Sequence, residues 1–286
     1  MKRTLTRLAA LSLAALIFSA APALAEEDVQ SSATQNAGSG SGSFADAASS
    51  ARPEDAYVGV QVDPDRVSEG DTLSFGYYEQ NGDRQRLQEP IKWIVLEKKD
   101  GMFLLLSGSG LDTGAYNDEK VRADWSESSL RQWLNTDFLN MAFTPEEQES
   151  IIETAIVTPG GSFRSPVTKE KIKIAEAPDT KDKVFLLSVS EVQEYFPKAS
   201  QRRSKNNGYL RGMPLDVKPY PAGNTKDDFR YGNWWLRDIR ADKGINCGFH
   251  VKSDGSIASA GQINLVRYVI RPAIWVDQDA LFYNEN

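Results

Sequence analysis

The sequence has one cysteine, Cys247, and one histidine, His250, in 286 residues. A single cysteine cannot form an intramolecular disulfide, so burial of apolar side chains has to stabilise the fold. A zinc site built from several histidines is excluded by the count. A Ser–His–Asp triad would have to use His250, and no G-x-S-x-G motif accompanies it. The chain therefore lacks the motifs of the common hydrolytic enzymes.

Cysteine–histidine catalysis is also disfavoured, although the two residues are close in sequence. Apolar residues alternate with polar ones around Cys247, Phe249 and Val251, which is the pattern of a half-buried β-strand. Cys247 and His250 differ by three positions, so they face opposite sides of that strand. We expect Cys247 to be a small core residue and His250 to be exposed.

The N-terminus has the three parts of a secretory signal peptide at residues 1–25. Lys2, Arg3 and Arg7 precede an apolar stretch over residues 8–20, and Ala23-Leu24-Ala25 forms a cleavage pattern. This segment holds three basic and no acidic residues, so its removal changes the net charge from −7 to −10. A soluble secreted or periplasmic protein is expected, with no membrane insertion after cleavage. Its negative charge disfavours nucleic acid and anionic lipid surfaces as partners.

Residues 26–56 are predicted to be a disordered linker, because they are rich in Ser, Gly and Ala and lack an apolar pattern. Residues 57–286 then form a single globular domain. Its pattern predicts an α+β fold with a mixed, mainly antiparallel sheet and two or three helices. Strands are expected at 72–78, 91–97, 102–107, 154–158, 183–188, 245–251, 256–261 and 265–276, and helices at 127–141, from 145 and at 191–196. Residues 198–230 look irregular, and long ordered loops are often functional.

Several short motifs resemble, in order, those of a bacterial exported family described as domain of unknown function 6273. They are FGYY at 75–78, PIKWIVL at 90–96, SLRQWLN at 129–135, KVFLLS at 183–188, WWLR at 234–237, VKSDGS at 251–256 and IRPAIW at 270–275. One departure is Asp238, which stands where the family has Ser-Pro. The family is distantly similar to C-type-lectin-like domains, and this resemblance implies a fold of that kind. It does not extend to the formylglycine-generating enzymes of that group, which use two active-site cysteines.

The WWLR motif supplies the candidate ligand-binding residues Trp235, Arg237 and His250. On a regular strand Trp235 and Arg237 share one face, next to the long loop, while Trp234 faces the core. An aromatic plane beside a cation can bind a sugar or a peptide. The alternative is that both tryptophans pack in the core. One or both of Arg237 and Arg271 are expected to be buried and paired with a carboxylate.

Calcium is the only cofactor for which the sequence offers ligands, and no other cofactor is expected. Asn224, Asp227 and Asp228 lie close together in the long loop and offer hard oxygen ligands. No EF-hand spacing is present, and Asp-rich turns are usually solvated.

The sequence favours a non-catalytic binding module at the cell envelope or outside it, with a cell-surface glycan or a protein as its ligand. Two alternatives remain open. One is an exported hydrolase that uses paired carboxylates, for which the many acidic residues give no specific signal. The other is a structural envelope component without a small ligand.

Overall fold

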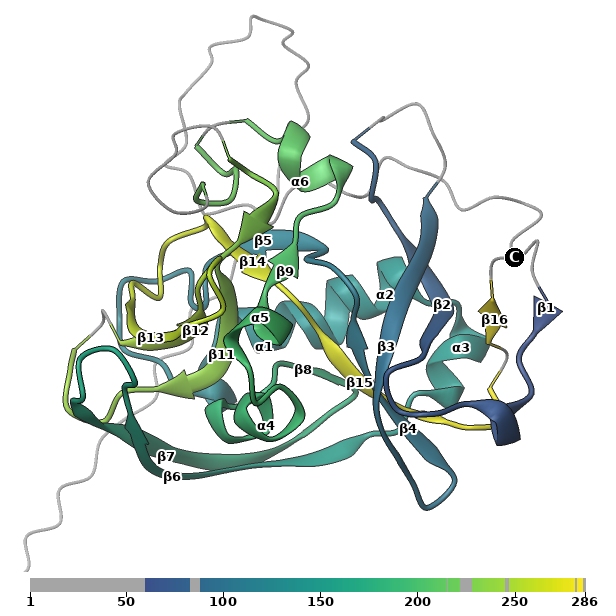
Figure 1. Cartoon of the computed structure of the whole chain (residues 1–286), viewed down its shortest axis with the longest axis horizontal. Coiled ribbons are helices and arrows are strands. Elements are labelled where there is room, and N and C mark those ends of the chain that lie inside the picture. The colour runs from purple at the N-terminus through teal and green to yellow at the C-terminus, as the bar shows by residue number, and fades with distance from the viewer. Residues whose placement is uncertain are drawn as a thin grey trace, which may run out of the picture. The chain divides into compact units, whose positions relative to one another are not determined.

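The computed structural model describes residues 60–82, 88–214, 216–221, 228–244, 247–280 and 282–284, all within the unit Gly40–Asn286. The expected signal peptide at residues 1–25 and linker at residues 26–56 lie outside the described residues. The described part is α+β, with mainly antiparallel sheets and short helices (Figure 1).

The larger sheet has seven strands, and all its neighbours are antiparallel. In spatial order they are β1 (Val60–Gln61), β16 (Tyr283–Asn284), β2 (Thr72–Tyr78), β3 (Glu89–Lys99), β4 (Met102–Ser107), β15 (Ala273–Asp277) and β8 (Val184–Phe185). The predicted strands at 72–78, 91–97 and 102–107 are confirmed as β2, β3 and β4. Gly101, between β3 and β4, has a φ of +76°, as its position in a tight turn requires.

The second sheet has five strands and contains the WWLR motif in its centre. Its order is β13 (Ile257–Gly261), β12 (Gly248–Val251), β11 (Trp234–Ile239), β14 (Tyr268–Ile270) and β5 (Asp112–Gly114). Only β11 and β14 run parallel. The strands predicted at 245–251 and 256–261 are confirmed as β12 and β13, which form a hairpin. Its turn residue Gly255 has a φ of +85°, and a Cβ there would lie 1.7 Å from the carbonyl oxygen of Ala199.

Two further strand pairs complete the β-structure. A long ribbon pairs β6 (Thr154–Arg164) with β7 (Lys171–Asp182), and a short pair joins β9 (Ser204–Lys205) to β10 (Tyr231–Gly232). The sequence predicted a strand only over 154–158. The strand continues beyond Thr158 because Gly160 adopts a φ of +71° beside the backbone of Glu176.

The helices are short, and they are more numerous than predicted. They are η2 (Pro64–Arg66), η3 (Trp125–Glu127), α1 (Ser129–Trp133), the π-helical turn η4 (Leu134–Phe138), α2 (Leu139–Ala142), α3 (Pro145–Ser150), α4 (Val189–Tyr195), α5 (Ala199–Arg202) and α6 (Gly208–Gly212). The predicted helix at 127–141 is thus interrupted by a π turn. The helix predicted from 145 is confirmed as α3, and a capping box of Thr144 and Glu147 starts it. No helix in the described ranges is long and apolar enough to cross a membrane.

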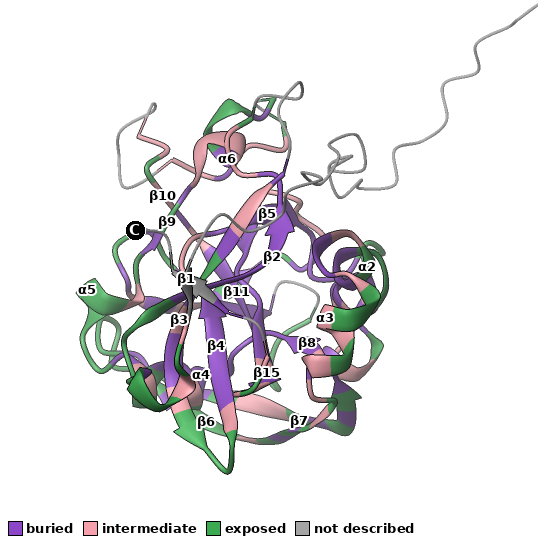
Figure 2. Ribbon diagram, turned by 90° about the vertical axis from the view of Figure 1, so that its right-hand side faces the viewer, coloured by how far each residue is buried: buried purple, intermediate pink, exposed green. Residues whose placement is uncertain are grey.

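The core includes both faces of the WWLR strand (Figure 2). Trp234 and Trp235 are both fully buried, which confirms the alternative that both pack in the core. The expectation that one of them faces a groove is wrong. The Trp234 indole donates to Arg202 O at 2.9 Å, and the Trp235 indole donates to Gly114 O at 2.9 Å. Because β11 is central in its sheet and covered on both sides, strand alternation separates the two rings without exposing either.

We predict that Trp234→Ala and Trp235→Ala each lower the free energy of unfolding by about 3–5 kcal/mol, because each leaves a large core cavity. Urea denaturation of the two variants measures this. Val167→Ala, at a side chain that is 74% exposed, is the control and should change stability by less than about 0.5 kcal/mol. A mild Trp235→Ala effect would show that this ring contacts solvent.

One carboxyl group in the core pairs with no cation among the described residues. Asp112 is fully buried, accepts a hydrogen bond of 2.7 Å from the Tyr78 hydroxyl and accepts another from Thr113 N at 2.7 Å. Burial raises the pKa of Asp112 to about 7, although both hydrogen bonds act in the opposite direction. The folded state therefore favours the protonated carboxyl group.

This shift predicts a pH dependence of stability. Since the folded pKa is raised, the contribution of Asp112 is fully present below its ordinary pKa and is lost as pH rises through about 7. Between about pH 4 and pH 7 the loss amounts to at most about 4 kcal/mol. Asp112→Asn should remove this slope, so the stability difference between the two proteins should change with pH. Urea denaturation across this range tests it, and parallel profiles would contradict a raised pKa.

Candidate functional site

A buried ion pair attaches helix α4 to the WWLR strand. The guanidinium of Arg237, which is 4% exposed, binds both carboxylate oxygens of Glu191, with Nη2 to Oε1 at 2.8 Å and Nη1 to Oε2. Arg237 Nη1 also donates to Leu186 O at 2.9 Å. The expectation that a buried Arg237 pairs with a carboxylate is confirmed.

Glu191 also caps its own helix. Its carboxylate accepts from Ser188 N at 2.6 Å, and Ser188 Oγ accepts from Glu191 N at 3.1 Å, which completes a capping box. Helix α4 therefore begins two residues before the predicted helix at 191–196. Burial alone would raise the pKa of Glu191. The charge of Arg237 and the hydrogen bonds from Arg237 and Ser188 outweigh burial and lower this pKa.

The residue after the motif contributes a second anchor. Asp238, which is buried, accepts a hydrogen bond of 2.5 Å from Val189 N at the first turn of α4. Strand β11 thus holds the N-terminal turn of α4 at two consecutive positions. These two contacts fix the direction of the helix axis. The C-terminal end of α4 carries Glu194 and Tyr195.

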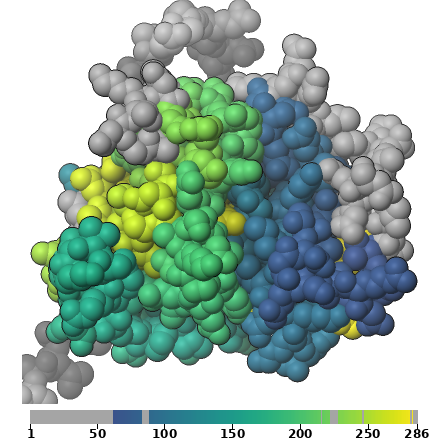
Figure 3. All heavy atoms as spheres, viewed as in Figure 1, coloured from purple at the N-terminus to yellow at the C-terminus, as the bar shows by residue number. Residues whose placement is uncertain are grey.

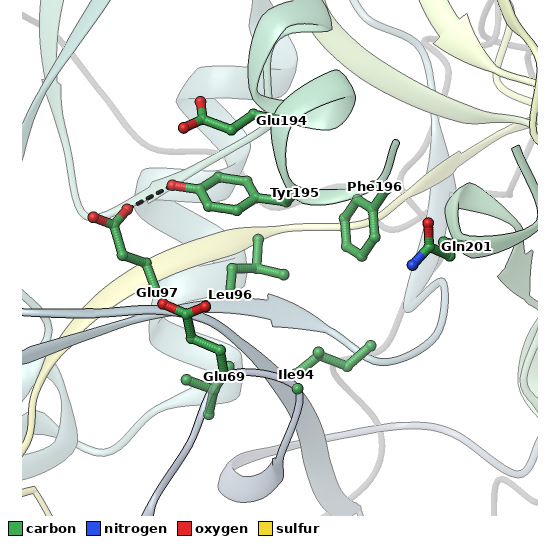
Figure 4. Close-up of a pocket in the computed structure, with 10 residues that line it drawn as sticks. Glu69, Ile94, Leu96, Glu97, Glu194, Tyr195, Phe196 and Gln201 are labelled. Atoms are coloured by element: carbon green, nitrogen blue, oxygen red, sulfur yellow. Dashed lines mark hydrogen bonds between the residues drawn. The ribbon is translucent and has the colours of Figure 1, made fainter. Parts of the chain in front are cut away.

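That end of α4 faces strand β3 across an open cleft of about 750 Å³ (Figure 4). Tyr195 spans the cleft and donates a hydrogen bond of 2.6 Å to Glu97 Oε2 on β3. The lining residues are Glu69, Gly70, Ile94, Val95, Leu96, Glu97, Glu194, Tyr195, Phe196 and Gln201. In Figure 3 the cleft lies at the boundary between the green surface of the α4–α5 region and the blue surface of the β2–β3 region.

The cleft combines an apolar floor with an acidic rim. Ile94, Leu96 and Phe196 supply the apolar side chains, and Figure 4 shows Leu96 between the carboxylates of Glu69 and Glu194, with Ile94 and Phe196 to one side. The ten described lining residues include three glutamates and no lysine, arginine or histidine. Burial, together with the hydrogen bond and charge of Glu97, raises the pKa of Tyr195, so this phenol stays neutral. The cleft therefore presents a negative potential over an apolar surface.

A second buried arginine lies beneath the cleft. Arg271 is 2% exposed, and its guanidinium lies 5.9 Å from the ring centroid of Phe196 and 5.1 Å from that of Trp234. Its Nε donates to Ser107 O at 2.8 Å, and burial lowers its pKa to about 10. No carboxylate in the described ranges pairs with Arg271, so of the two motif arginines only Arg237 has a counter-ion there. Arg271 contributes through its contacts with the two rings.

The structure brings together two of the three predicted ligand-binding residues. The rings of Trp235 and His250 lie 6.2 Å apart, and both pack on Tyr268, at centroid distances of 3.9 Å and 4.9 Å. Arg237 contacts a different set of neighbours, centred on Glu191. Trp235 and Arg237 are therefore placed in the core and do not line the cleft.

His250 is 5% exposed, so the expectation of an exposed strand residue is wrong. It pairs with Trp235 across the centre of the five-stranded sheet, where Tyr268 covers it. Burial lowers the pKa of His250 to about 4, which keeps the imidazole neutral at physiological pH. Cys247 is a buried free thiol as predicted, and burial raises its pKa, which disfavours the reactive thiolate.

Of the three residues predicted to bind calcium, Asn224 and Asp227 lie outside the described residues. The carboxylate of Asp228 binds the guanidinium of Arg230 at 2.9 Å and 3.0 Å, and these hydrogen bonds lower the pKa of Asp228 to about 2. Its oxygens are thus already occupied by a cation. Within the described ranges, no group of three or more His, Cys, Asp or Glu side chains could hold a metal ion.

Sequence reasoning missed the cleft. Glu97 and Tyr195 lie 98 positions apart, and neither belongs to a recognisable motif. The polar positions of β3 indicated only that Glu97 leaves the core face. The one available signal was the Ser188 to Glu191 capping box, which starts the helix that carries Tyr195.

We predict that Arg237→Met destabilises the fold by about 3–5 kcal/mol, because it leaves Glu191 as an uncompensated charge. Since the pKa of Glu191 is lowered in the folded state, its contribution is present above its ordinary pKa of 4.5 and is lost as pH falls through the folded value. The variant should lose most of this acid sensitivity. Urea denaturation between about pH 6 and pH 3 measures both effects.

The control for this prediction is Arg66→Met. Arg66 lies 3.4 Å from Asp63 in an exposed pair and should contribute less than about 1 kcal/mol. Equal losses in the two variants, or unchanged acid sensitivity in Arg237→Met, would show that the buried pair does not hold α4.

The model of the family described as "Domain of unknown function (DUF6273)" matches residues 100–278. Comparison with the curated proteins and with the solved structures gives no match. The matched range includes α4, the WWLR strand and the closing strand β15, whereas Glu69 and Glu97 of the cleft precede it. Because the match spans more than half of the chain, this protein belongs to the DUF6273 family.

Proposed function

We propose that this protein is an exported, non-catalytic binding module and that its cleft takes a cationic segment of another protein. The observation that carries the proposal is the cleft itself, in which three glutamates lie along one side of a group of apolar side chains. Its volume of about 750 Å³ lies within the range of known ligand sites. The proposal includes a fold related to the C-type-lectin-like domains, which rests on the order of the sequence motifs.

Lysine and arginine side chains fit such a cleft. Each has an apolar stem that can lie on Ile94, Leu96 and Phe196, and a charged head that can reach a glutamate on the rim. Neutral sugars would leave the negative potential of the rim uncompensated. Between the glycan and the protein ligands expected from the sequence, the charge of the cleft therefore favours a basic protein segment.

Binding to a short peptide of alternating lysine and leucine tests the proposal by calorimetry. The triple variant Glu69→Gln, Glu97→Gln and Glu194→Gln should bind this peptide about tenfold more weakly, because each exposed charge pair contributes roughly 0.2–1 kcal/mol. Raising the salt concentration should weaken binding to the unmodified protein and have less effect on the variant.

The matched control replaces three exposed glutamates outside the cleft, by Glu149→Gln, Glu153→Gln and Glu176→Gln, with the same change in net charge. This control should bind the peptide as the unmodified protein does. If both triple variants bound the peptide equally weakly, net charge alone would explain the loss of affinity, and the cleft would not be the binding site. Cleavage of the peptide would favour the hydrolase alternative.

A further inference from the structure

Three half-buried aromatic rings at the end of the long loop each have a cation over one face. The cation-to-centroid distances are 3.7 Å for Arg203 over Tyr231, 4.3 Å for Lys218 over Phe229 and 4.5 Å for Arg267 over Tyr220. We refer to these six residues as the loop face. None of them lines the acidic cleft.

The six residues are joined to one another. Arg267 Nε donates to Lys218 O at 2.7 Å, so the cation over Tyr220 is tied to the residue that covers Phe229. Phe229 O accepts from Asn206 Nδ2 at 2.8 Å, and Tyr231 pairs with Lys205 in the β9–β10 ladder. These contacts connect the three ring–cation pairs through shared neighbours.

The segment that supplies most of this surface is basic within an acidic protein. Residues 198–231 hold eight Lys or Arg and three Asp or Glu, a net charge of +5, whereas the whole chain has −7. The rest of the chain therefore carries −12. The positive charge of residues 198–231 attracts an anionic group to this face. The negative charge of the rest of the protein repels extended polyanions.

The stacked arginines keep donors available for such a group. Arg203 uses Nε to bind Ser253 O at 3.1 Å, and Arg267 uses Nε to bind Lys218 O. In the described part of the chain no carboxylate forms an ion pair with Arg203, Lys218 or Arg267. A guanidinium stacked on a ring still presents its in-plane N–H groups, which match a carboxylate, sulfate or phosphate. The nearby carboxylate of Asp228 is bound to Arg230, although its charge also acts on Arg203.

We propose that the loop face binds a carbohydrate that carries carboxylate, sulfate or phosphate groups. The cations bind the anionic groups, and the half-buried rings of Tyr220, Phe229 and Tyr231, each with a cation over one face, contact the sugar through their remaining exposed area. This ligand differs in charge and chemistry from the one proposed for the cleft, and the two sites are independent. The overall negative charge disfavours nucleic acid and anionic membranes, which would extend beyond the basic segment.

The test uses four oligosaccharides of equal length, one carboxylated, one sulfated, one phosphorylated and one neutral, with binding followed by calorimetry. At least one anionic oligosaccharide should bind, and the neutral one should bind at least tenfold more weakly. The triple variant Arg203→Met, Lys218→Met and Arg267→Met should raise the dissociation constant at least tenfold. The single variant Lys218→Met should raise the dissociation constant about threefold. Because the Lys218 side chain donates no hydrogen bond within the described structure, this variant should fold even if the triple variant does not.

The control variant Lys120→Met, Lys171→Met and Lys181→Met removes three exposed cations elsewhere and should bind the oligosaccharide as the unmodified protein does. The proposal is overturned if no anionic oligosaccharide binds, if the control loses as much affinity, or if a single-stranded oligonucleotide or a vesicle with anionic lipid binds more tightly. The glutamine variant of the cleft should keep its carbohydrate affinity, so the failure of one site is distinguishable from the failure of the other.

Discussion

The buried pair between Arg237 and Glu191 determines where the helix that forms the cleft lies. An arginine that is 4% exposed has a large desolvation cost, and a carboxylate that binds it through both oxygens compensates for that cost. Glu191 also belongs to the capping box of α4. The same carboxylate therefore compensates the buried charge of Arg237 and fixes the start of the helix. With its first turn fixed by Arg237 and Asp238, α4 places Tyr195 within hydrogen-bond distance of Glu97 on the other sheet. The WWLR motif thus acts on the cleft from the core, without lining it.

The sequence predicted local structure well, but it predicted poorly which residues are buried by segments that are distant in the chain. Alternation identified the β12–β13 hairpin and the burial of Cys247, because these depend on residues within one strand pair. The same alternation separated Trp234 from Trp235 correctly but could not reveal that Tyr268 and Tyr116 cover one of them. Alternation states which residues share a face, whereas exposure depends on segments far away in the chain. The error on His250 has the same origin, since its cover also comes from Tyr268.

The two surfaces differ in how far the sequence could have indicated them. The basic character of residues 198–231 is visible in a count of charges, but the seating of each cation on a ring depends on the folded loop. The cleft has no such signal, because Glu97 and Tyr195 meet only after the sheet and α4 have packed. Part of its rim also precedes the range matched by the family model, while α4 lies inside that range. Helix α4 therefore lies within the region matched by the family model. Glu69 and Glu97, on the opposite side of the cleft, lie in the segment that precedes this region.

Separation of opposite charges distinguishes the two surfaces proposed as binding sites from the rest of the described structure. Elsewhere in the described structure, cations and carboxylates that meet neutralise each other, as Arg240 does with Glu170 and Asp242, and Arg131 with Asp182. On the cleft, Glu97 meets a neutral phenol instead of a cation, so its negative charge persists. On the loop face, Arg203 meets an aromatic ring and a carbonyl oxygen, so its positive charge persists. Helix α5 lies between them, with Gln201 on the cleft and Arg203 immediately after the helix. Neutral groups thus hold the charged side chains in place on each surface, and the charges themselves stay available to ligands.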